Sequence, residues 1–358
     1  MTAQRILICL HDFSRGGTER IALGLAESWK QAGRDVTILC GSLEGGLCDS
    51  ATVKIEELEP LVRRGFLSRF RLARAMGRRL SALRPDVIFL PGNYHALLAN
   101  TLRKADPRPA IALKISNPPL PRGIPFVRAA FRHATGSVDG FAAMNSGLAR
   151  ELKMMLPGRN IATLHDPAYI RSRAELPRRG RRRNILWIGR LEPQKDPVLA
   201  LKTMRAVGGS AHLTMLGEGS LLDEIERLIQ AWQLEKQVTL MGHVPEIEAH
   251  LASADALLIT SRYEGGPAVA VEALAMDVPV VSTDCSYLLQ DLLKSPESGR
   301  IVTSRDASEL AAALLAICDQ ARAPLRKLAT PFEPETRAKA YLDWFDSLLV
   351  ERSATIRS

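Results

Sequence analysis

The sequence predicts an α/β protein with two doubly wound domains, each built on a parallel sheet with helices on both faces. Short apolar runs alternate with amphipathic segments of helix length along nearly the whole chain. Some runs, such as Val87–Leu90 and Ala256–Ile259, are apolar throughout, which is typical of parallel strands buried on both faces. The length of 358 residues exceeds twice the roughly 150 residues of an average domain, so two domains are expected.

The first domain is expected at residues 1–165. It opens with a strand at Arg5–Leu10, continues with a helix at Gly17–Ala32 and returns with a strand at Asp35–Cys40. Further strands are expected near the apolar runs Asp86–Leu90, Ala110–Ile115 and Gly140–Met144.

The alternation stops at residues 166–183, which carry seven arginines and two prolines but a single Glu after the opening Asp. We interpret this segment as a basic linker to a second domain at 184–330. Strands of the second domain are expected near these runs: Asn184–Ile188, His212–Leu216, Val238–Met241, Ala256–Ile259 and Val278–Val281. Residues 331–358 are expected to form a final helix and tail. Its apolar side chains recur at helical spacing within Pro334–Val350: Tyr341, Trp344, Phe345 and Leu348.

The composition excludes several classes of protein. Hydrophobic residues make up 46% of the chain and charged residues 24%, which rules out a disordered, collagen-like or coiled-coil protein. No apolar stretch approaches the roughly 20 residues of a membrane-spanning helix. The N-terminal apolar run ends at His11 and Asp12 and is too short for a signal peptide, so a cytoplasmic location is expected. The five cysteines form no Cys-x-x-Cys pair and favour reduced thiols over a zinc site or disulfides.

The formal net charge of +9 indicates an anionic partner: nucleic acid, an anionic membrane surface or a phosphorylated substrate. Nucleic acid is not expected, because the chain has no recognition motif or aromatic RNA-binding signature. Residues Val62–Arg84 contain eight arginines and no acid, and their apolar residues recur at helical spacing. One interpretation is a helix packed on the core with its arginines in water. The other is an interfacial helix on anionic lipid.

The most informative stretch is Ser261–Leu274, which follows a buried strand. Its Gly265-Gly266-Pro267 turn is suited to begin a helix, whose first amide groups lack partners within the helix and can bind a phosphate or a hydroxyl-rich ligand. Glu264 and Glu272 flank the turn, and ionised carboxylates accept hydrogen bonds from vicinal sugar hydroxyls. The alternative is a capped turn with two solvated glutamates.

A second cluster follows the first strand of the second domain. Gly189 allows a close backbone approach, while Arg190 and Lys195 bring two cations to the end of that strand. Two cations there can neutralise a diphosphate. The alternative is a solvated basic loop.

In the first domain, Gly16 and Gly17 follow the first strand in a loop that is suited to phosphate but matches neither Gly-x-Gly-x-x-Gly nor a P-loop. A dinucleotide site and a nucleoside triphosphatase are therefore not indicated. No Asp-x-Asp pair occurs, which argues against a diphosphate held through a divalent metal. No metal or other cofactor is expected.

Five motifs occur in order in the second domain. They are Gly-Arg-Leu-x-x-x-Lys from Gly189, Leu-Gly-Glu-Gly from Leu216, Met-Gly-His-Val from Met241, Ala-Asp-Ala from Ala254 and Glu-x7-Glu from Glu264. This stretch, Ile185 to Asp284, resembles glycosyltransferase family 4, the retaining, metal-independent enzymes of GT-B architecture. The first domain matches more loosely. The resemblance implies two Rossmann-like domains facing across a cleft, with the last helix crossing back to the first domain.

The resemblance also implies roles for individual residues. Arg190 and Lys195 would stabilise the departing nucleoside diphosphate, Glu264 would contact hydroxyls of the donor sugar, and Glu272 would bind the ribose. The remaining donor-binding residues would act through glycine or main-chain groups: Gly16, Gly17, Gly189, Gly242, His243, Val244, Gly265, Gly266 and Pro267. Retention in this family is usually explained by front-face attack, so no catalytic base is named.

Two departures from the family pattern stand out. Many relatives have a histidine after the strand equivalent to Ala110–Ile115, where this chain has none, and the nearby His95 and His165 receive no role. Many relatives also have a bulky residue at the position of Gly266. The smaller residue would widen the sugar pocket, which leaves the donor sugar open.

The expected function is transfer of a hexose or N-acetylhexosamine, with retention, from a nucleotide sugar to a glycan or lipid-linked glycan in cell-surface polysaccharide or glycolipid synthesis. A UDP-sugar is the preferred donor. The alternatives are a GDP-mannose-dependent mannosyltransferase, a nucleotide-sugar 2-epimerase of the same fold and a non-catalytic anion-binding protein. A peripheral position on the inner face of the membrane is also expected, through these side chains: Arg63, Arg64, Phe66, Arg69, Phe70 and Arg71.

Overall fold

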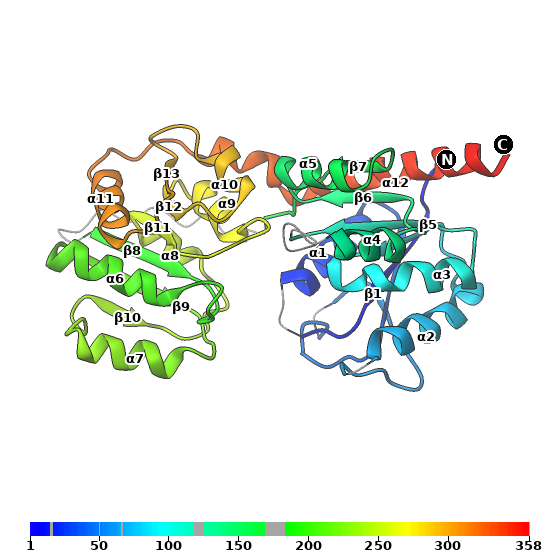
Figure 1. Ribbon diagram of the computed structural model, residues 1–358, viewed down its shortest axis with the longest axis horizontal. Coiled ribbons are helices and arrows are strands. Elements are labelled where there is room, and N and C mark those ends of the chain that lie inside the picture. Colours follow the sequence, from blue (N-terminus) through cyan, green and yellow to red (C-terminus); the bar gives the residue numbers. More distant parts are fainter. Residues whose placement is uncertain (15–16, 50, 66, 118–124, 169–182, 358) are drawn as a thin grey trace. The chain divides into compact units, whose positions relative to one another are not determined.

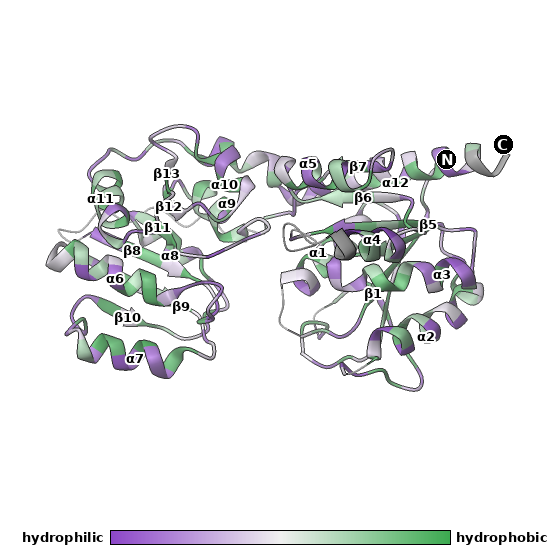
Figure 2. Cartoon of the chain, viewed as in Figure 1, coloured by the Kyte–Doolittle hydropathy of each residue, from purple (hydrophilic) through white to green (hydrophobic). Residues whose placement is uncertain are grey.

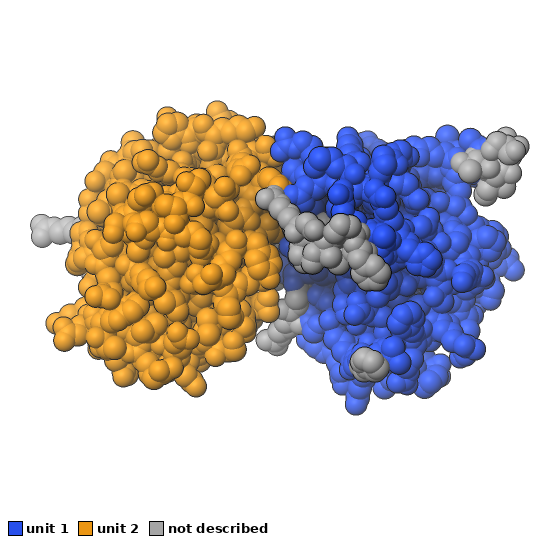
Figure 3. Space-filling view, in the orientation of Figure 1, with its two compact units in different colours: residues 1–167, 334–358 blue, residues 168–333 orange. Residues whose placement is uncertain are grey.

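The computed structural model describes residues 1–357 except 15–16, 50, 66, 118–124 and 169–182. The chain forms two compact units (Figure 3). Unit 1 comprises Met1–Pro167 together with Pro334–Ser358, and unit 2 comprises Ala168–Glu333. Most of the predicted linker, residues 169–182, lies outside the described residues.

Unit 1 is built on a seven-stranded parallel sheet with the order β3-β2-β1-β4-β5-β6-β7. Its strands are β1 (Arg5–Leu10), β2 (Asp35–Cys40), β3 (Lys54–Glu57), β4 (Val87–Leu90), β5 (Ala110–Ile115), β6 (Gly140–Ala143) and β7 (Asn160–Thr163). Its helices are α1 (Gly17–Gln31), α2 (Ser68–Leu83), the 3₁₀ helix η1 (Asn93–Leu98), α3 (Ala99–Ala105), α4 (Pro125–Ala134), α5 (Ser146–Met155) and α12 (Pro334–Arg357). Figure 1 shows these elements.

Unit 2 is built on a six-stranded parallel sheet with the order β10-β9-β8-β11-β12-β13. Its strands are β8 (Arg183–Ile188), β9 (Ala211–Leu216), β10 (Val238–Leu240), β11 (Ala256–Ile259), β12 (Val280–Thr283) and β13 (Gly299–Val302). Its helices are α6 (Pro197–Val207), η2 (Gly208–Ser210), α7 (Leu222–Ala231), α8 (Glu248–Ser253), α9 (Ala268–Ala275), α10 (Tyr287–Leu292), α11 (Ala307–Cys318), η3 (Arg326–Leu328) and η4 (Thr330–Phe332). Both units are Rossmann-like, as predicted, and the central strands of both sheets are hydrophobic along much of their length (Figure 2).

The strands that the sequence did not predict lie at the edges of the sheets. β3 and β7 have half-buried or exposed residues throughout, so they lack the continuous apolar run of a central strand. β12 begins two residues later than predicted, after Pro279, which has no backbone N–H to donate to a neighbouring strand.

Helix α12 completes unit 1 through an aromatic cluster. Phe345 of α12 packs on Trp29 of α1 with ring centroids 5.1 Å apart, and Tyr341 packs on Phe89 of β4 at 5.7 Å. A Cβ atom at Gly140 would lie 2.6 Å from the Leu348 side chain, so a glycine is needed where α12 crosses β6.

Helix α2 is shorter than predicted. It starts at Ser68, because Leu67 adopts a left-handed conformation with φ 60°, and its buried face is formed by Leu72, Met76 and Leu80 with their neighbours. Phe70 therefore lies off the buried stripe and is 61% exposed. Val62 is buried in the loop before the helix. None of the described helices is long and apolar enough to cross a membrane.

Candidate active site

Four of the five motifs in unit 2 lie along one edge of its sheet, where the carboxyl ends of the strands meet; we call this the carboxyl edge. The Ala-Asp-Ala motif lies at the opposite end of β11. Hydrogen bonds join the loops that follow neighbouring strands. The Gly189 N–H donates to Leu216 O (3.0 Å), and the Gly217 N–H donates to Gly242 O (2.7 Å). The structure therefore brings together the loops after β8, β9 and β10.

Glycines allow two of these loops to touch. A Cβ atom at Gly217 would lie 1.9 Å from Gly189 O, and one at Gly219 would lie 2.4 Å from Leu191 O. Contacts of that length are too short for any side chain. The Gly-x-Gly of this motif thus packs the β9 loop against the loop that carries Arg190 and Lys195.

Lys195 and Glu264 form the central ion pair of the site. Lys195 Nζ lies 2.5 Å from Glu264 Oε1, and their side chains are 20% and 11% exposed. Ser261 Oγ donates to the same carboxylate oxygen at 2.7 Å. Both of these hydrogen bonds go to Oε1, while an ammonium has three donors and a carboxylate has two oxygens. Each partner thus retains polar capacity for a ligand.

Backbone contacts hold the two loops that carry this pair. The Arg262 N–H donates to Gln194 O at 2.8 Å. Thr260 Oγ1 accepts from Trp187 Nε1 (3.0 Å) and donates to Lys195 O (2.9 Å). The sequence motifs gave no sign of the roles of Ser261 and Thr260, although both directly follow β11.

Arg190 is exposed, and within the described part of the chain no hydrogen bond or ion pair engages its guanidinium group. The nearby Glu192 is turned toward Ser220, whose N–H (3.0 Å) and hydroxyl (2.8 Å) donate to its carboxylate. These hydrogen bonds lower the pKa of Glu192. The charge of Arg190 is thus available to a ligand.

Helix α9 starts at the same edge. Pro267 is its N-cap rather than its first residue, and it offers no side-chain hydrogen bond to the first turn. The Glu264 N–H donates to Cys285 O (2.7 Å), and Ser286 Oγ donates to Gly265 O (3.3 Å), so the loop between β11 and α9 is fixed against the loop after β12. Glu272 lies within α9 and is 3% exposed.

The loop that carries the predicted donor-binding residues Gly242, His243 and Val244 follows β10. Gly242 adopts φ 67°, and the next residue, His243, donates its N–H to Glu218 Oε1 at 3.3 Å. Val244 is half-buried and packs against the apolar core of the unit. The loop therefore borders the Leu-Gly-Glu-Gly turn.

Unit 1 carries an ion cluster at its own carboxyl edge that the sequence did not reveal. Arg64 forms ion pairs with Asp12, which follows β1, and with Glu19 of α1, the latter at 3.0 Å. Burial alone raises the pKa of Asp12, but hydrogen bonds from Arg64 and Ser14 outweigh it and lower the pKa to about 2. Burial raises the pKa of Glu19 despite Arg64. Tyr94, after β4, stacks under the Arg64 guanidinium group at 5.3 Å.

This cluster corrects the prediction that Arg64 faces a membrane, because its side chain is turned toward two buried carboxylates. Arg63 pairs with the exposed Glu44 (3.0 Å), and Arg69 stacks on Tyr94 (4.9 Å). Arg71 is exposed, and its side chain has no ion pair or hydrogen bond with the described residues. Phe66 lies outside the described residues.

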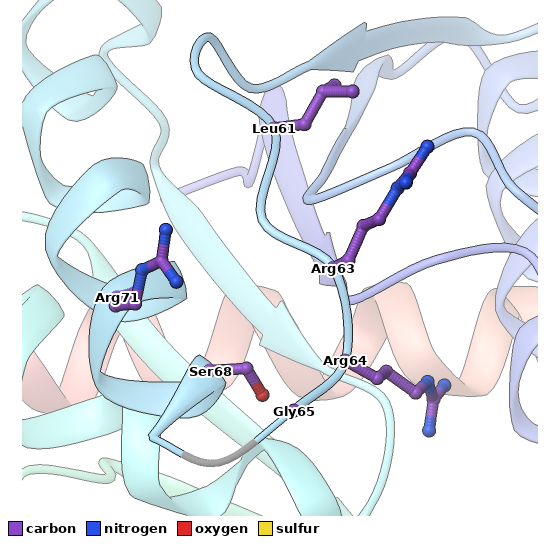
Figure 4. Close-up of a pocket in the computed structure, with 6 residues that line it drawn as sticks. All are labelled: Leu61, Arg63, Arg64, Gly65, Ser68 and Arg71. Carbon is purple, nitrogen blue, oxygen red and sulfur yellow. The ribbon is translucent and has the colours of Figure 1, made fainter.

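Arg63, Arg64 and Arg71 line an open cavity of about 590 Å³ in unit 1. Figure 4 shows Arg63 and Arg64 extending from the loop before α2 and Arg71 from the helix itself. The other lining residues are Leu61, Gly65 and Ser68.

The other predicted residues of unit 1 are placed as follows. A Cβ atom at Gly17 would meet no other atom within 4 Å, so there is free space beside it, whereas Gly16 lies outside the described residues. His165 Nδ1 lies 2.7 Å from Met144 O. His95 is 2% exposed, and burial lowers its pKa to about 3. Among the described residues, no group of three or more His, Cys, Asp or Glu side chains could hold a metal ion.

Two parallel-sheet Rossmann-like units with this edge define a GT-B protein. The family Glycosyl transferases group 1 matches residues 169–330, and the family Glycosyl transferase 4-like domain matches residues 16–157. Each half of the chain is therefore a glycosyltransferase domain, and the pair has GT-B architecture.

Individual relatives agree with this class. The N-acetylgalactosamine-N,N'-diacetylbacillosaminyl-diphospho-undecaprenol 4-alpha-N-acetylgalactosaminyltransferase of Campylobacter jejuni is 31% identical over 48% of this chain and 45% of its own length. The glycogen synthase of Mycobacterium tuberculosis is 31% identical over 44% of this chain and 40% of its own length. The chain thus spans less than half the length of these curated relatives. The structure of Anabaena HepE in complex with UDP and glucose superposes over 99% of this chain and 100% of its own, with a TM-score of 0.74 and 15% identity.

Proposed function

We propose that the chain is a hexosyltransferase that moves a sugar, with retention of anomeric configuration, from a nucleotide sugar to a glycan or glycolipid acceptor. The observation that carries this proposal is the Lys195–Glu264 pair at the carboxyl edge of unit 2, with the exposed Arg190 on the same loop as Lys195. The pair combines a cation for a diphosphate with a carboxylate for sugar hydroxyls.

The chemistry follows from the charges that develop during transfer. The bond between the anomeric carbon and the phosphate oxygen breaks, and its electron pair leaves with the nucleoside diphosphate. Lys195 and Arg190 would stabilise that negative charge, which grows toward the transition state. The acceptor hydroxyl oxygen would bond to the anomeric carbon on the face that the diphosphate leaves, and its proton would pass to the departing diphosphate oxygen.

Glu264 would orient the donor sugar in this scheme. Its Oε1 atom accepts from Lys195 and from Ser261 at 2.7 Å, which holds the carboxylate in one position. The second oxygen, Oε2, would accept a hydrogen bond from a hydroxyl group of the donor sugar. The buried Glu272 of α9 would bind the ribose. Because Lys195 and Ser261 already hold the Glu264 carboxylate, it loses little conformational freedom when the donor binds.

A UDP-sugar is the proposed donor, with GDP-mannose as the second choice. The Anabaena structure of similar fold contains UDP and glucose, which supports UDP. A lipid-linked glycan is the proposed acceptor, because the Campylobacter relative is described as acting on a diphospho-undecaprenol glycan. No metal is proposed to take part.

A panel of nucleotide sugars tests the proposal. The right donor at about 100 times its Kd should raise the free energy of unfolding by roughly 2.7 kcal/mol, and it should be hydrolysed slowly without acceptor. The Lys195→Met variant should lose the hydrolysis and retain the fold. Stabilisation by a sugar nucleotide with conversion only to its 2-epimer would identify an epimerase. Binding of inorganic diphosphate and every sugar nucleotide alike, without turnover, would identify an anion-binding protein.

We further propose that unit 1 docks on anionic membranes through the outer face of α2. Arg71, Arg74 and Arg78 are exposed there at helical spacing, and none of their side chains has an ion pair or hydrogen bond with the described residues. Near the start of the helix, Leu67 and Phe70 are 55% and 61% exposed. Each arginine near an anionic surface contributes about 1 kcal/mol, within a Debye length of roughly 8–10 Å. Three arginines, with the apolar side chains of Leu67 and Phe70 at one end, suit reversible attachment of the helix to a membrane surface.

Co-sedimentation with vesicles of anionic phospholipid at low ionic strength tests this surface. The triple variant Arg71→Gln, Arg74→Gln, Arg78→Gln should lose binding. A matched variant that removes three exposed cations of unit 2, Lys202→Gln, Arg227→Gln and Lys236→Gln, should bind as the wild type does. Equal binding by both variants, or none by the wild type, would contradict the proposal.

A further inference from the structure

Arg305 connects the two loops that carry the Lys195–Glu264 pair. Its Nη2 donates to Asp196 Oδ2 (2.7 Å) and to Thr260 O (3.0 Å), and its Nη1 donates to Ser261 O (2.8 Å). Asp196 is the residue after Lys195, and Thr260 and Ser261 precede Glu264. One guanidinium group therefore bonds to both halves of the site from a third loop, the one after β13.

The backbone at this junction has an uncommon conformation. Asp196 has φ 49° and Arg305 has φ 54°, both in the left-handed region. For residues other than glycine this conformation is unfavourable and persists only where surrounding contacts hold it. The Asp196 carboxylate supplies such contacts, since it accepts from Arg305 and, through Oδ1, from the Leu199 N–H at the start of α6 (3.3 Å).

The direction of the Lys195 side chain depends on this junction. Lys195 is the last residue before the left-handed turn at Asp196, so a change of φ there would rotate the loop that presents the ammonium group. On the other side, Arg305 binds the carbonyl groups immediately before the Glu264 loop. Within the described part of the chain, Arg305 forms no hydrogen bond or ion pair with Lys195 or Glu264.

We infer that Arg305 is a positioning residue for sugar transfer: it holds the Lys195 and Glu264 loops in the arrangement that the transition state requires, and it acts through Lys195. This inference rests on the proposed function. Arginine suits the task because its planar group has five donors in a fixed fork, whereas a lysine at this position would offer one compact ammonium group. A shift of about 1 Å in a catalytic group can cost roughly 100-fold in rate.

The primary test compares two arginines of unit 2 that both bind backbone carbonyls. Arg305→Met should lower kcat about 10- to 100-fold and change the KM for the donor by less than about threefold. Arg305→Lys should recover part of kcat. The matched control is Arg322→Met, because Arg322 Nη2 donates to Ala254 O (2.8 Å) before β11, at the opposite end of that strand. The control should leave kcat unchanged, even where it lowers the melting temperature as much as Arg305→Met does.

A double-mutant cycle tests whether Arg305 acts through Lys195. If it does, adding Arg305→Met to Lys195→Ala should lower kcat little further, because the group being positioned is already absent. Independent losses that multiply would overturn the inference, as would equal kcat in Arg305→Met and Arg322→Met. Full activity in Lys195→Ala itself would instead overturn the proposed function, so the two failures are distinguishable.

Discussion

Ion pairs lie at the carboxyl edges of both units, but the ratio of cations to carboxylates in the two clusters is opposite. In unit 2, the single carboxylate of Glu264 faces Lys195, and Arg190 stands exposed on the same loop. In unit 1, the single guanidinium group of Arg64 lies between the carboxylates of Asp12 and Glu19. The Lys195–Glu264 pair together with Arg190 thus has one more cation than acids, and the Arg64 cluster has one more acid than cations.

This difference assigns different ligands to edges of similar topology. A diphosphate is attracted to an edge with free cations and repelled by one with spare carboxylates. A ligand rich in hydroxyl groups suits the second, because carboxylates accept hydrogen bonds from it. These charges support the proposal that the donor binds at unit 2, and we further propose that the sugar portion of an acceptor binds at unit 1.

The largest expected effect removes the cations of unit 2. Arg190→Ala and Lys195→Ala should each lower kcat about 100-fold or more, because losing a contact to developing charge costs roughly 2.7–4 kcal/mol. Steady-state kinetics with the identified donor measures this. Lys202→Ala, on the exposed side of α6, is the control. Near-normal turnover in the Arg190→Ala, Lys195→Ala double variant would show that these two cations do not stabilise the departing diphosphate.

The next effect concerns stability and belongs to unit 1. Arg64→Gln should lower the free energy of unfolding by about 1–3 kcal/mol, because it leaves Asp12 and Glu19 buried without their cation. Arg63→Gln breaks only an exposed ion pair with Glu44 and should change the free energy of unfolding by less than about 0.5 kcal/mol. Urea denaturation compares the two variants. Equal effects would mean that Arg64 is an ordinary surface arginine.

A smaller effect is the acid sensitivity of unit 1. His95 is buried near Arg64 and His11, and burial chiefly lowers its pKa from 6.5 to about 3. Between those pH values the unfolded chain binds a proton at this histidine that the folded chain does not. Stability should therefore fall as the pH drops from 6.5 toward 3, by at most about 1.4 kcal/mol per pH unit.

Replacing the histidine removes this contribution. His95→Gln should flatten the dependence of the unfolding free energy on pH between 6 and 4, while the exposed His133 replaced by Gln should not. In NMR, the His95 ring signals should not titrate in that range. A titration midpoint near 6.5 would contradict the burial of this ring.

The smallest expected effect is that of a chelator. EDTA should leave transfer activity unchanged, because cationic side chains are proposed to serve where other enzymes use a divalent metal. Activity lost to EDTA and restored by Mg²⁺ or Mn²⁺ would show that the cations of unit 2 are not sufficient. Activity assays before and after dialysis make the measurement.

Local patterns allowed most of the strands of both units to be predicted. The strands at Arg5–Leu10 and Ala256–Ile259 match in full, because buried parallel strands are continuous apolar runs. Lys195 and Glu264 were recognised because each lies in a short motif at a strand end. Their direct contact could not be predicted, since it depends on how two loops far apart in the chain approach each other.

Two arginines mark the limit of this reasoning. Arg64 looked like part of a basic helix, but it precedes the helix, and periodicity says nothing about where a loop side chain points. Arg305 lies in no motif, and only the sheet order places the end of β13 near the loops after β8 and β11. Side chains that act from loops across a sheet edge leave no periodic signal.

The return of α12 to unit 1 has a consequence for biosynthesis. Trp29 and Phe89 precede unit 2 in the chain, yet the rings that cover them, Tyr341 and Phe345, follow unit 2 and are made after it. The N–H of Ala3 likewise bonds to Asp346 Oδ1 (2.7 Å). Unit 2 holds all of its strands in one continuous stretch and can fold as soon as that stretch emerges. During translation, the first part of unit 1 is therefore made before unit 2 but is completed only after unit 2, and it needs protection from aggregation in the interval.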